Sequence, residues 1–146
     1  LASFIAFYFH LIFENVRLVQ TTSASEMFEQ ILRIGEEDII IGISFTRYSK
    51  KTVKALNYAH SRNARVIAIT DSISSPLVKE SDYFLQARSD MASFVDSLVA
   101  PLSLINALIM AVGLQKQEEL KHTFDKLEEI WDEYDVYEKA EADNAE

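Results

Sequence analysis

Two largely apolar runs near the middle of the chain give the strongest structural signal in the sequence. Asp38–Ile43 reads DIIIGI and Ala64–Thr70 reads ARVIAIT, and both have the length of a strand. Strands of a parallel sheet are covered on both faces, so they are apolar throughout rather than alternating. A shorter run at Asp82–Ala87 and a β-branched run at Val16–Val19 predict two further short strands.

Helical patterns fill the intervals between these runs. Leu1–Asn15 is apolar on nearly every side, which is typical of a helix buried in protein. Ser23 and Glu26 have the spacing of a capping box, so we expect a helix from Ser23 to about Arg33. Its apolar residues share one face: Met27, Phe28, Ile31 and Leu32.

Three more helices are predicted after the first central strand. One covers about Ser49–Asn63, with Val53, Leu56 and Ala59 on its inner face. Ser75 followed by Pro76 is a cap followed by proline at the first helical position, which predicts a short helix there. Ala92–Val112 is long and apolar, and Pro101 within it is expected to kink or split the helix.

The alternation of strands and helices predicts an α/β fold: a three-layer sandwich with a central parallel sheet and helices on both faces. In such a fold a strand normally precedes the first helix, so the chain is expected to begin just after a first strand. Ligands bind beyond the carboxyl ends of the strands. The loops of interest are therefore those after Ile43, after Thr70 and before the first helix.

A C-terminal helix follows, with apolar residues spaced four and three apart. We expect it to extend to about Tyr137 and the residues from Glu138 onward to be frayed or disordered. The seam either packs on its own domain or on a second copy, and we favour the second copy. It consists of Leu120, Phe124, Leu127, Trp131 and Tyr134.

Charge divides the chain at about residue 115. The net charge is −9, and residues 116–146 carry 12 acidic and 4 basic side chains, so the first 115 residues are nearly neutral. We therefore expect a folded domain at 1–115 and an acidic helix and tail at 116–146. Neither part has the basic face that nucleic-acid binding requires.

Cysteine is absent, and the 3 histidines are far apart in sequence. Disulfides are thereby excluded and a metal site is not expected, which favours a reducing cytoplasm. The apolar stretch 1–13 is too short to span a membrane. The stretch 94–114 is long enough but contains Asp96, Pro101 and Asn106, so both are interpreted as buried helices and no membrane partner is expected.

The loop after the first central strand carries the chemistry. Ser44–Thr52 reads SFTRYSKKT, with five hydroxyls and three cations, and leads directly into a helix. Free N–H groups at a helix N-terminus, small hydroxyls and an arginine together favour a phosphate. In the alternative interpretation Ser49 is only a cap and Lys50 and Lys51 form a solvated face. We adopt that alternative for the two lysines.

Several motifs occur in the order and spacing of one family. They are DIIIGIS (Asp38–Ser44), FTRYS (Phe45–Ser49), ARVIAITD (Ala64–Asp71), SPL (Ser75–Leu77), SD (Ser81–Asp82) and DSLVAPLSLINALI (Asp96–Ile109). In these segments the chain resembles the sugar isomerase (SIS) domain, a flavodoxin- or Rossmann-like fold. More narrowly, it resembles the SIS domain of the RpiR/MurR family of bacterial transcription regulators. The resemblance covers most of residues 1–115.

The resemblance implies a phosphosugar site. SIS domains hold the phosphate with a Ser-x-Ser-Gly-x-Thr loop, onto which Ser44, Thr46 and Ser49 fall, each keeping a hydroxyl. Arg47 replaces the glycine, which is a departure. A second motif before the first helix, Gly-x-Gly-x-Ser-x-x-x-Ala, is reduced to Ser3 and Ala6, without its glycines. The implied ligand-binding residues are Ser3, Ser44, Thr46, Arg47, Tyr48 and Ser49.

Three functions follow from this resemblance. The first is a sensor that binds a phosphorylated sugar, forms a homodimer or higher homo-oligomer and reaches DNA only through a helix-turn-helix domain outside this chain. It needs no cofactor and is not an enzyme. The second is a phosphosugar isomerase, against which Lys51 stands where the family's enzymes often have an acid. His60 and Asp71 are substitute bases, although Asp71 is more typical of a turn. The third is an oligomerisation domain whose ligand site has decayed.

Overall fold

A computed structural model describes residues 1–89 and 96–137. It contains a central sheet of three parallel strands in the order β1-β2-β3. The strands are β1 (Ile39–Ile43), β2 (Arg65–Thr70) and β3 (Tyr83–Gln86). Ile39 pairs with Arg65 and Ile67 pairs with Tyr83, so each strand is in parallel register with the next. The predicted α/β fold with a parallel sheet is confirmed.

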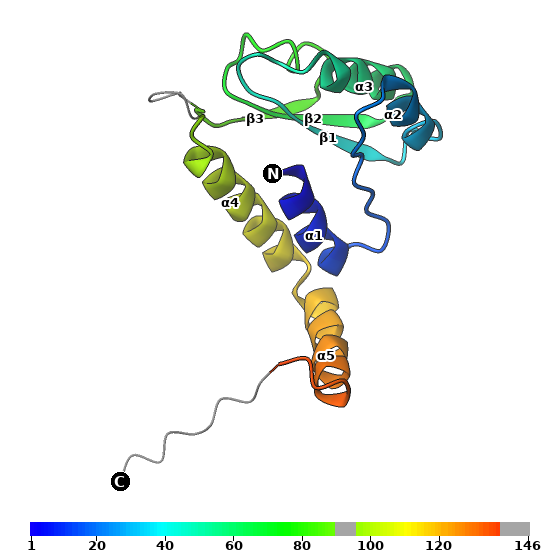
Figure 1. Ribbon diagram of the computed structural model, residues 1–146, viewed down its shortest axis with the longest axis vertical. Helices are drawn as coiled ribbons and strands as arrows, with labels where there is room; N and C mark the ends of the chain where they lie inside the picture. Colours follow the sequence, from blue (N-terminus) through cyan, green and yellow to red (C-terminus); the bar gives the residue numbers. More distant parts are fainter. Residues whose placement is uncertain (90–95, 138–146) are drawn as a thin grey trace.

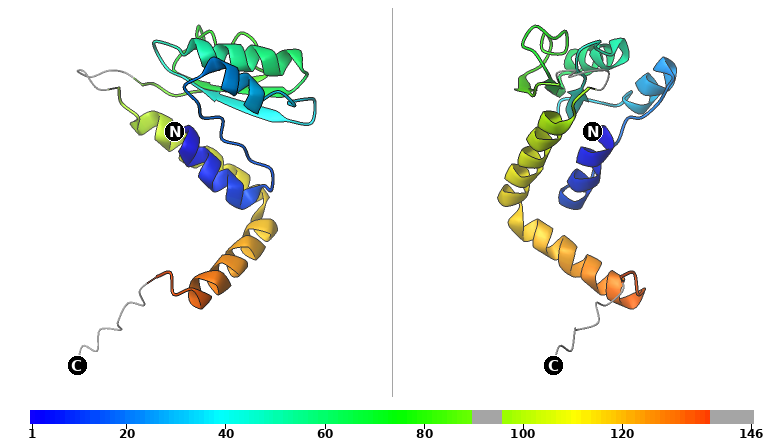
Figure 2. Two further views of the ribbon diagram at one scale, coloured as in Figure 1. Left: turned by 45° about the vertical axis from the view of Figure 1, so that its right-hand side comes forward. Right: turned by 60° about the vertical axis from the view of Figure 1, so that its left-hand side comes forward.

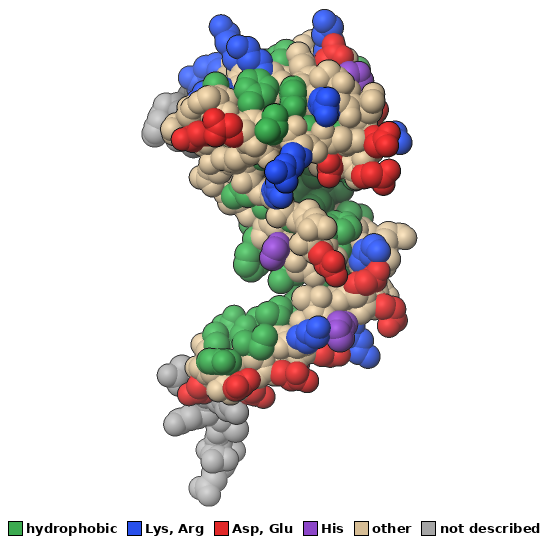
Figure 3. Space-filling model, turned by 90° about the vertical axis from the view of Figure 1, so that its right-hand side faces the viewer, with side chains coloured by type: hydrophobic (Ala, Val, Ile, Leu, Met, Phe, Trp, Pro, Cys, Tyr) green, Lys and Arg blue, Asp and Glu red, His purple; other side chains and the backbone are tan. Residues whose placement is uncertain are grey.

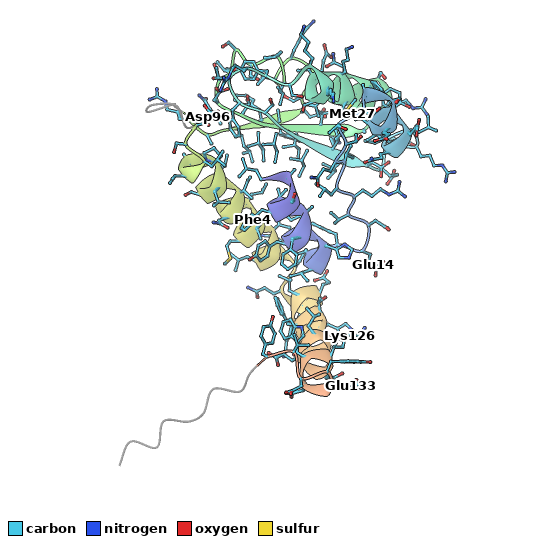
Figure 4. All side chains as sticks on the ribbon, viewed as in Figure 1. Phe4, Glu14, Met27, Asp96, Lys126 and Glu133 are labelled. Carbon is cyan, nitrogen blue, oxygen red and sulfur yellow. The ribbon has the colours of Figure 1, made fainter. Side chains whose placement is uncertain are left out.

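Helices cover both faces of this sheet (Figure 1). The bounds are α1 (Ala2–Ile12), α2 (Ala24–Gln30), α3 (Lys50–Ser61), α4 (Val99–Gln115) and α5 (Gln117–Glu133). α2 and α3 lie on one face, whereas α1 and α4 lie side by side on the other and run away from the sheet (Figures 1 and 2). α5 lies farthest from the sheet. Met27 and Phe4 mark the two opposite faces (Figure 4).

The face beneath α3 has a tightly packed core. Leu56 and Ala59 of α3 are buried against Val66 and Ala68 of β2. A Cβ atom on Gly42 of β1 would lie 2.7 Å from the Leu56 methyl carbons, so any other residue at this position would require Leu56 to shift. The predicted inner face of α3, with Val53 packed at its edge, is confirmed.

The opposite face is closed by α1 and α4. Ile5 of α1 and Ile105 of α4 are buried with Ile69 of β2. Met27 of α2 and Ile31, the C-cap residue of this helix, are buried as predicted. Leu32 is 61% exposed, because the helix ends at Gln30 rather than near Arg33.

Two predicted elements are absent from the described chain. Val16–Val19 forms no strand; it belongs to the connection that crosses from α1 on one face to α2 on the other, and it has no strand beside it (Figure 1). Ser75 starts no helix. Its side chain accepts from the N–H of Leu77, and the chain continues as turns with Val78 donating to Ser75 O at 3.0 Å. Burial of Leu77 requires the chain to bend inward there.

The expected kink at Pro101 is also wrong. α4 begins at Val99, so Pro101 lies in the first helical turn, where its missing N–H would have no acceptor within the helix. The part of the predicted helix at 92–95, and the predicted frayed end from 138 to 146, lie outside the described residues.

Among the described helices, none is by itself long and apolar enough to span a membrane, and only α4 and α5 together pass that test, across a bend of 98°.

Candidate functional site

The loop between β1 and α3 holds all the predicted site residues except Ser3. It begins where Ser44 donates its N–H to Ile69 O of β2 at 3.1 Å, continuing the sheet by one residue. It ends at Ser49, the N-cap of α3. The loop therefore lies at the carboxyl end of β1, where ligands of parallel sheets bind.

Two serine hydroxyls organise the entry into α3. Ser44 Oγ accepts from the N–H of Ser49 at 2.9 Å, and Ser49 Oγ accepts from the N–H of Thr52 at 3.3 Å. In the described part of the chain, the N–H groups of Lys50 and Lys51 have no acceptor. They are first-turn donors at the positive end of the helix dipole, so an anion can bind there.

Asp71 is the central acceptor of the loop, a role that the sequence interpretation missed. It follows β2, and its Oδ2 accepts from the N–H of Thr46 at 2.9 Å and from the Thr46 hydroxyl. Its Oδ1 accepts from the Tyr48 hydroxyl at 2.8 Å. Tyr48 is therefore a hydrogen-bond donor to Asp71, and one carboxylate joins the loops after β1 and β2.

Hydrogen bonding sets the charge of this cluster. Partial burial opposes ionisation of Asp71, but the hydrogen bonds from Thr46 and Tyr48 outweigh it and hold the pKa of this carboxyl below its ordinary value. Burial, followed by the hydrogen bond to Asp71, raises the pKa of Tyr48. At neutral pH the cluster therefore consists of a carboxylate and a protonated phenol.

Arg47 has a backbone conformation that suits glycine. Its φ is 69°, in the left-handed region, and its side chain is 74% exposed. Its guanidinium lies 3.4 Å from a carboxylate oxygen of Asp96, which precedes α4 (Figure 4). Left-handed backbone costs a side-chain-bearing residue about 1–2 kcal/mol, so the arginine is retained here against backbone strain.

Arg47→Gly is expected to raise the free energy of unfolding by about 1 kcal/mol, because glycine adopts a positive φ without a clash and the exposed ion pair contributes little. Arg47→Ala is the matched control, since it removes the same ion pair but keeps the strain. Chemical denaturation of both variants measures the difference. A lower stability for Arg47→Gly than for Arg47→Ala would show that the positive φ at this position does not strain a residue with a side chain.

Lys51 and Ser3 lie apart from the hydroxyl cluster. The Lys51 ammonium donates to Thr22 O ahead of α2, so it is not simply a solvated lysine. Ser3 is exposed on α1 and lines a hollow of about 340 Å³ with Phe7, His10 and other, mainly apolar residues. Within the described residues no hydrogen bond joins Ser3 to the loop.

The family model of the SIS domain matches residues 1–111. An uncharacterised HTH-type transcriptional regulator from Caldanaerobacter subterraneus is 29% identical over 97 residues, which make up 64% of this chain and 34% of that protein. The chain thus spans about a third of the length of the curated relatives it matches.

Two solved structures have the same fold. The sugar isomerase domain of an RpiR transcription factor from Sphaerobacter thermophilus has a TM-score of 0.81 and 24% identity, covering 88% of this chain and 71% of that chain. The NanR protein of Vibrio vulnificus, in complex with ManNAc-6P, has a TM-score of 0.73 and 19% identity, covering 88% of this chain and 49% of that chain. At these identities the similarity establishes the fold.

Proposed function

The chain belongs to the SIS domain family, and from that premise we propose that it is the ligand-sensing domain of a transcription regulator. It binds a phosphorylated sugar at the loop Ser44–Ser49. The proposal rests on the backbone N–H groups of Lys50 and Lys51, which have no acceptor among the described residues. They lie at the start of α3, next to the hydroxyls of Ser44 and Ser49. A phosphate is acceptor-only, so it complements such a set.

The relatives support a regulatory role for the whole protein. The curated relatives are HTH-type transcriptional regulators, and the NanR structure was obtained with ManNAc-6P. We propose that residues 1–115 hold the sugar phosphate and that 116–146 form an acidic extension. DNA binding then belongs to a helix-turn-helix domain outside this chain, because neither part has a basic face.

A sensor fits the loop better than an isomerase does. Isomerisation needs a base that removes a proton next to a carbonyl. Asp71, the carboxylate among the loop's hydrogen bonds, accepts from Thr46 and Tyr48, and its lowered pKa makes it a weak base. Lys51, where family enzymes often have an acid, donates to a backbone carbonyl instead.

A thermal-shift screen tests the sensor proposal. A hexose or hexosamine 6-phosphate at a hundredfold excess over its Kd is expected to stabilise the chain by about 2.7 kcal/mol, or roughly 5–10 °C in Tm. The free sugars are the controls and are expected to leave Tm unchanged. Absence of a shift with every sugar phosphate would favour a decayed site, and conversion of the sugar phosphate during incubation would favour an enzyme.

We also propose that the chain pairs with a second copy through α4. This helix has no charged residue, yet Val99, Leu102, Met110 and Leu114 are exposed. Exposed apolar surface of this kind marks interfaces. The apolar patch along α5 (Figure 3) extends the same proposal to the predicted seam. A sugar phosphate that binds one pairing better than another would then shift the equilibrium between them.

The pairing is tested by sedimentation velocity. The natural chain is expected to sediment as a dimer or larger at high concentration, and Met110→Glu is expected to lower the assembled fraction, because burial of a lone charge is costly. Asn57→Glu, which adds the same charge at an exposed position of α3, is the control. A monomer at every concentration would contradict the proposal.

A further inference from the structure

The acceptor in the middle of the candidate phosphate loop is already an anion of the chain itself. Thr46 gives both its N–H and its hydroxyl hydrogen to Asp71 Oδ2, and Tyr48 gives its hydroxyl hydrogen to Asp71 Oδ1. These are donors that the family pattern assigns in part to phosphate, since Thr46 takes the place of the second serine. Here they are used by a carboxylate.

The Asp71 carboxylate and a bound phosphate cannot both accept the hydrogen of the Thr46 hydroxyl. A hydroxyl carries one hydrogen, and a phosphate dianion has only acceptor oxygens. While the Thr46 hydroxyl donates to Asp71, it has no hydrogen left to give to a phosphate. The phosphate can engage Thr46 only if Thr46 releases Asp71.

Asp71 is held firmly from its own side of the sheet, so the loop after β1 is the part that must move. Gln86 of β3 donates to Asp71 O at 2.9 Å. Thr70, which is fully buried, donates to Ser75 Oγ at 2.8 Å and lies 3.3 Å from Asp71 Oδ1. These contacts anchor Asp71 to β2 and β3, whereas Thr46 lies exposed at the outside of its loop.

We propose that Asp71 is an internal competitor of the ligand, which occupies the Thr46 donors in the empty site and must be exchanged for the phosphate. This inference rests on the proposed phosphosugar function. The exchange has a structural consequence, because it removes the Thr46 part of the connection between the loops after β1 and β2 and leaves Tyr48 as the donor to Asp71. Ligand binding thereby loosens the β1 loop from the end of β2.

Asp71→Asn separates the charge from the shape of the side chain. The amide oxygen still accepts from Thr46 or Tyr48, but the negative charge near the phosphate is gone. We expect inorganic phosphate to bind Asp71→Asn about tenfold more tightly than the natural chain, since one unit of like charge is removed at close range. Asp71→Ser, which keeps a small neutral acceptor, is a second variant and is expected to change the affinity in the same direction.

The matched control is Asp38→Asn. Asp38 also accepts a backbone N–H, from Gly35 at 2.9 Å, but it precedes β1 at the opposite end of the sheet. It changes the net charge by the same amount, so it corrects for long-range electrostatics. Circular dichroism and thermal unfolding establish that each variant is folded before isothermal titration calorimetry with inorganic phosphate.

The outcomes separate the two proposals. Tighter binding by the Asp71 variants alone supports the competitor, and so does binding by them when the natural chain shows none. Equal or weaker binding by both variants, with a natural chain that binds, overturns the competitor but leaves the phosphate site intact. Equal tightening by Asp38→Asn also overturns it. No binding of inorganic phosphate by any of the proteins overturns the competitor, and the proposed function is then decided by the thermal-shift screen with sugar phosphates.

Discussion

Ser44→Ala is expected to weaken the binding of a sugar phosphate by about 10- to 100-fold. The Ser44 hydroxyl oxygen accepts the N–H of Ser49 at 2.9 Å, so its hydrogen is free to be donated to a bound phosphate. A hydrogen bond to a charged group contributes about 1.5–3 kcal/mol. The alanine removes that donor and also releases the N-cap residue of α3 from the position it holds. Calorimetric titration with a hexosamine 6-phosphate measures the loss.

Ser61→Ala is the control for this prediction. Ser61 lies at the other end of α3, where its hydroxyl donates to Tyr58 O at 2.7 Å. The substitution removes a hydroxyl from α3 without touching the loop, so the affinity is expected to remain unchanged. If Ser44→Ala bound as tightly as Ser61→Ala, the assignment of Ser44 to the phosphate would be wrong.

Leu56→Ala is expected to lower the free energy of unfolding by about 2–5 kcal/mol, the range for large-to-small substitutions in a packed core. Leu56 is 1% exposed and lies against Gly42 of β1 and the small residues Ala59 and Ala68. Glycine and alanine have little side chain with which to fill the space, so the cavity would persist. Denaturation in urea measures the change.

Leu32→Ala is the matched substitution on the surface. Leu32 is 61% exposed, so its truncation is expected to change stability by less than about 0.5 kcal/mol. Comparable losses for the two variants would contradict the placement of Leu56 at the centre of the core. Leu56 also fixes α3 against β1, so its loss is expected to weaken ligand binding as well.

The elements that the sequence predicted correctly are those whose signal is local. β1 and β2 are continuous apolar runs, and α3 has a side-chain cap at Ser49 together with an apolar face. The errors arose where tertiary context decided the outcome. Val16–Val19 has strand propensity but crosses between layers without a partner, and Ser75 uses its hydroxyl inside the core rather than to start a helix.

The position of the candidate site was predictable from the sequence, but its hydrogen bonds were not. Hydroxyls after a buried strand and before a helix located the loop at Ser44–Ser49. The carboxyl ends of neighbouring parallel strands meet at one edge, and that rule placed the loop after Thr70, with Asp71, beside the candidate site. It did not predict the hydrogen bonds from Thr46 and Tyr48, because both partners are distant in sequence and aspartate after a strand is typical of a turn. The positive φ of Arg47 explains why a glycine is usual there.

The loop between β1 and α3 is the proposed binding site of a sugar phosphate. The most direct test follows the backbone amide signals of the isotope-labelled chain by NMR during titration with a hexosamine 6-phosphate. We expect the largest shifts to fall on Ser44–Thr52 and on Asp71, and the free sugar to leave these signals in place. Shifts confined to the hollow around Ser3 and His10, or none at all, would contradict it.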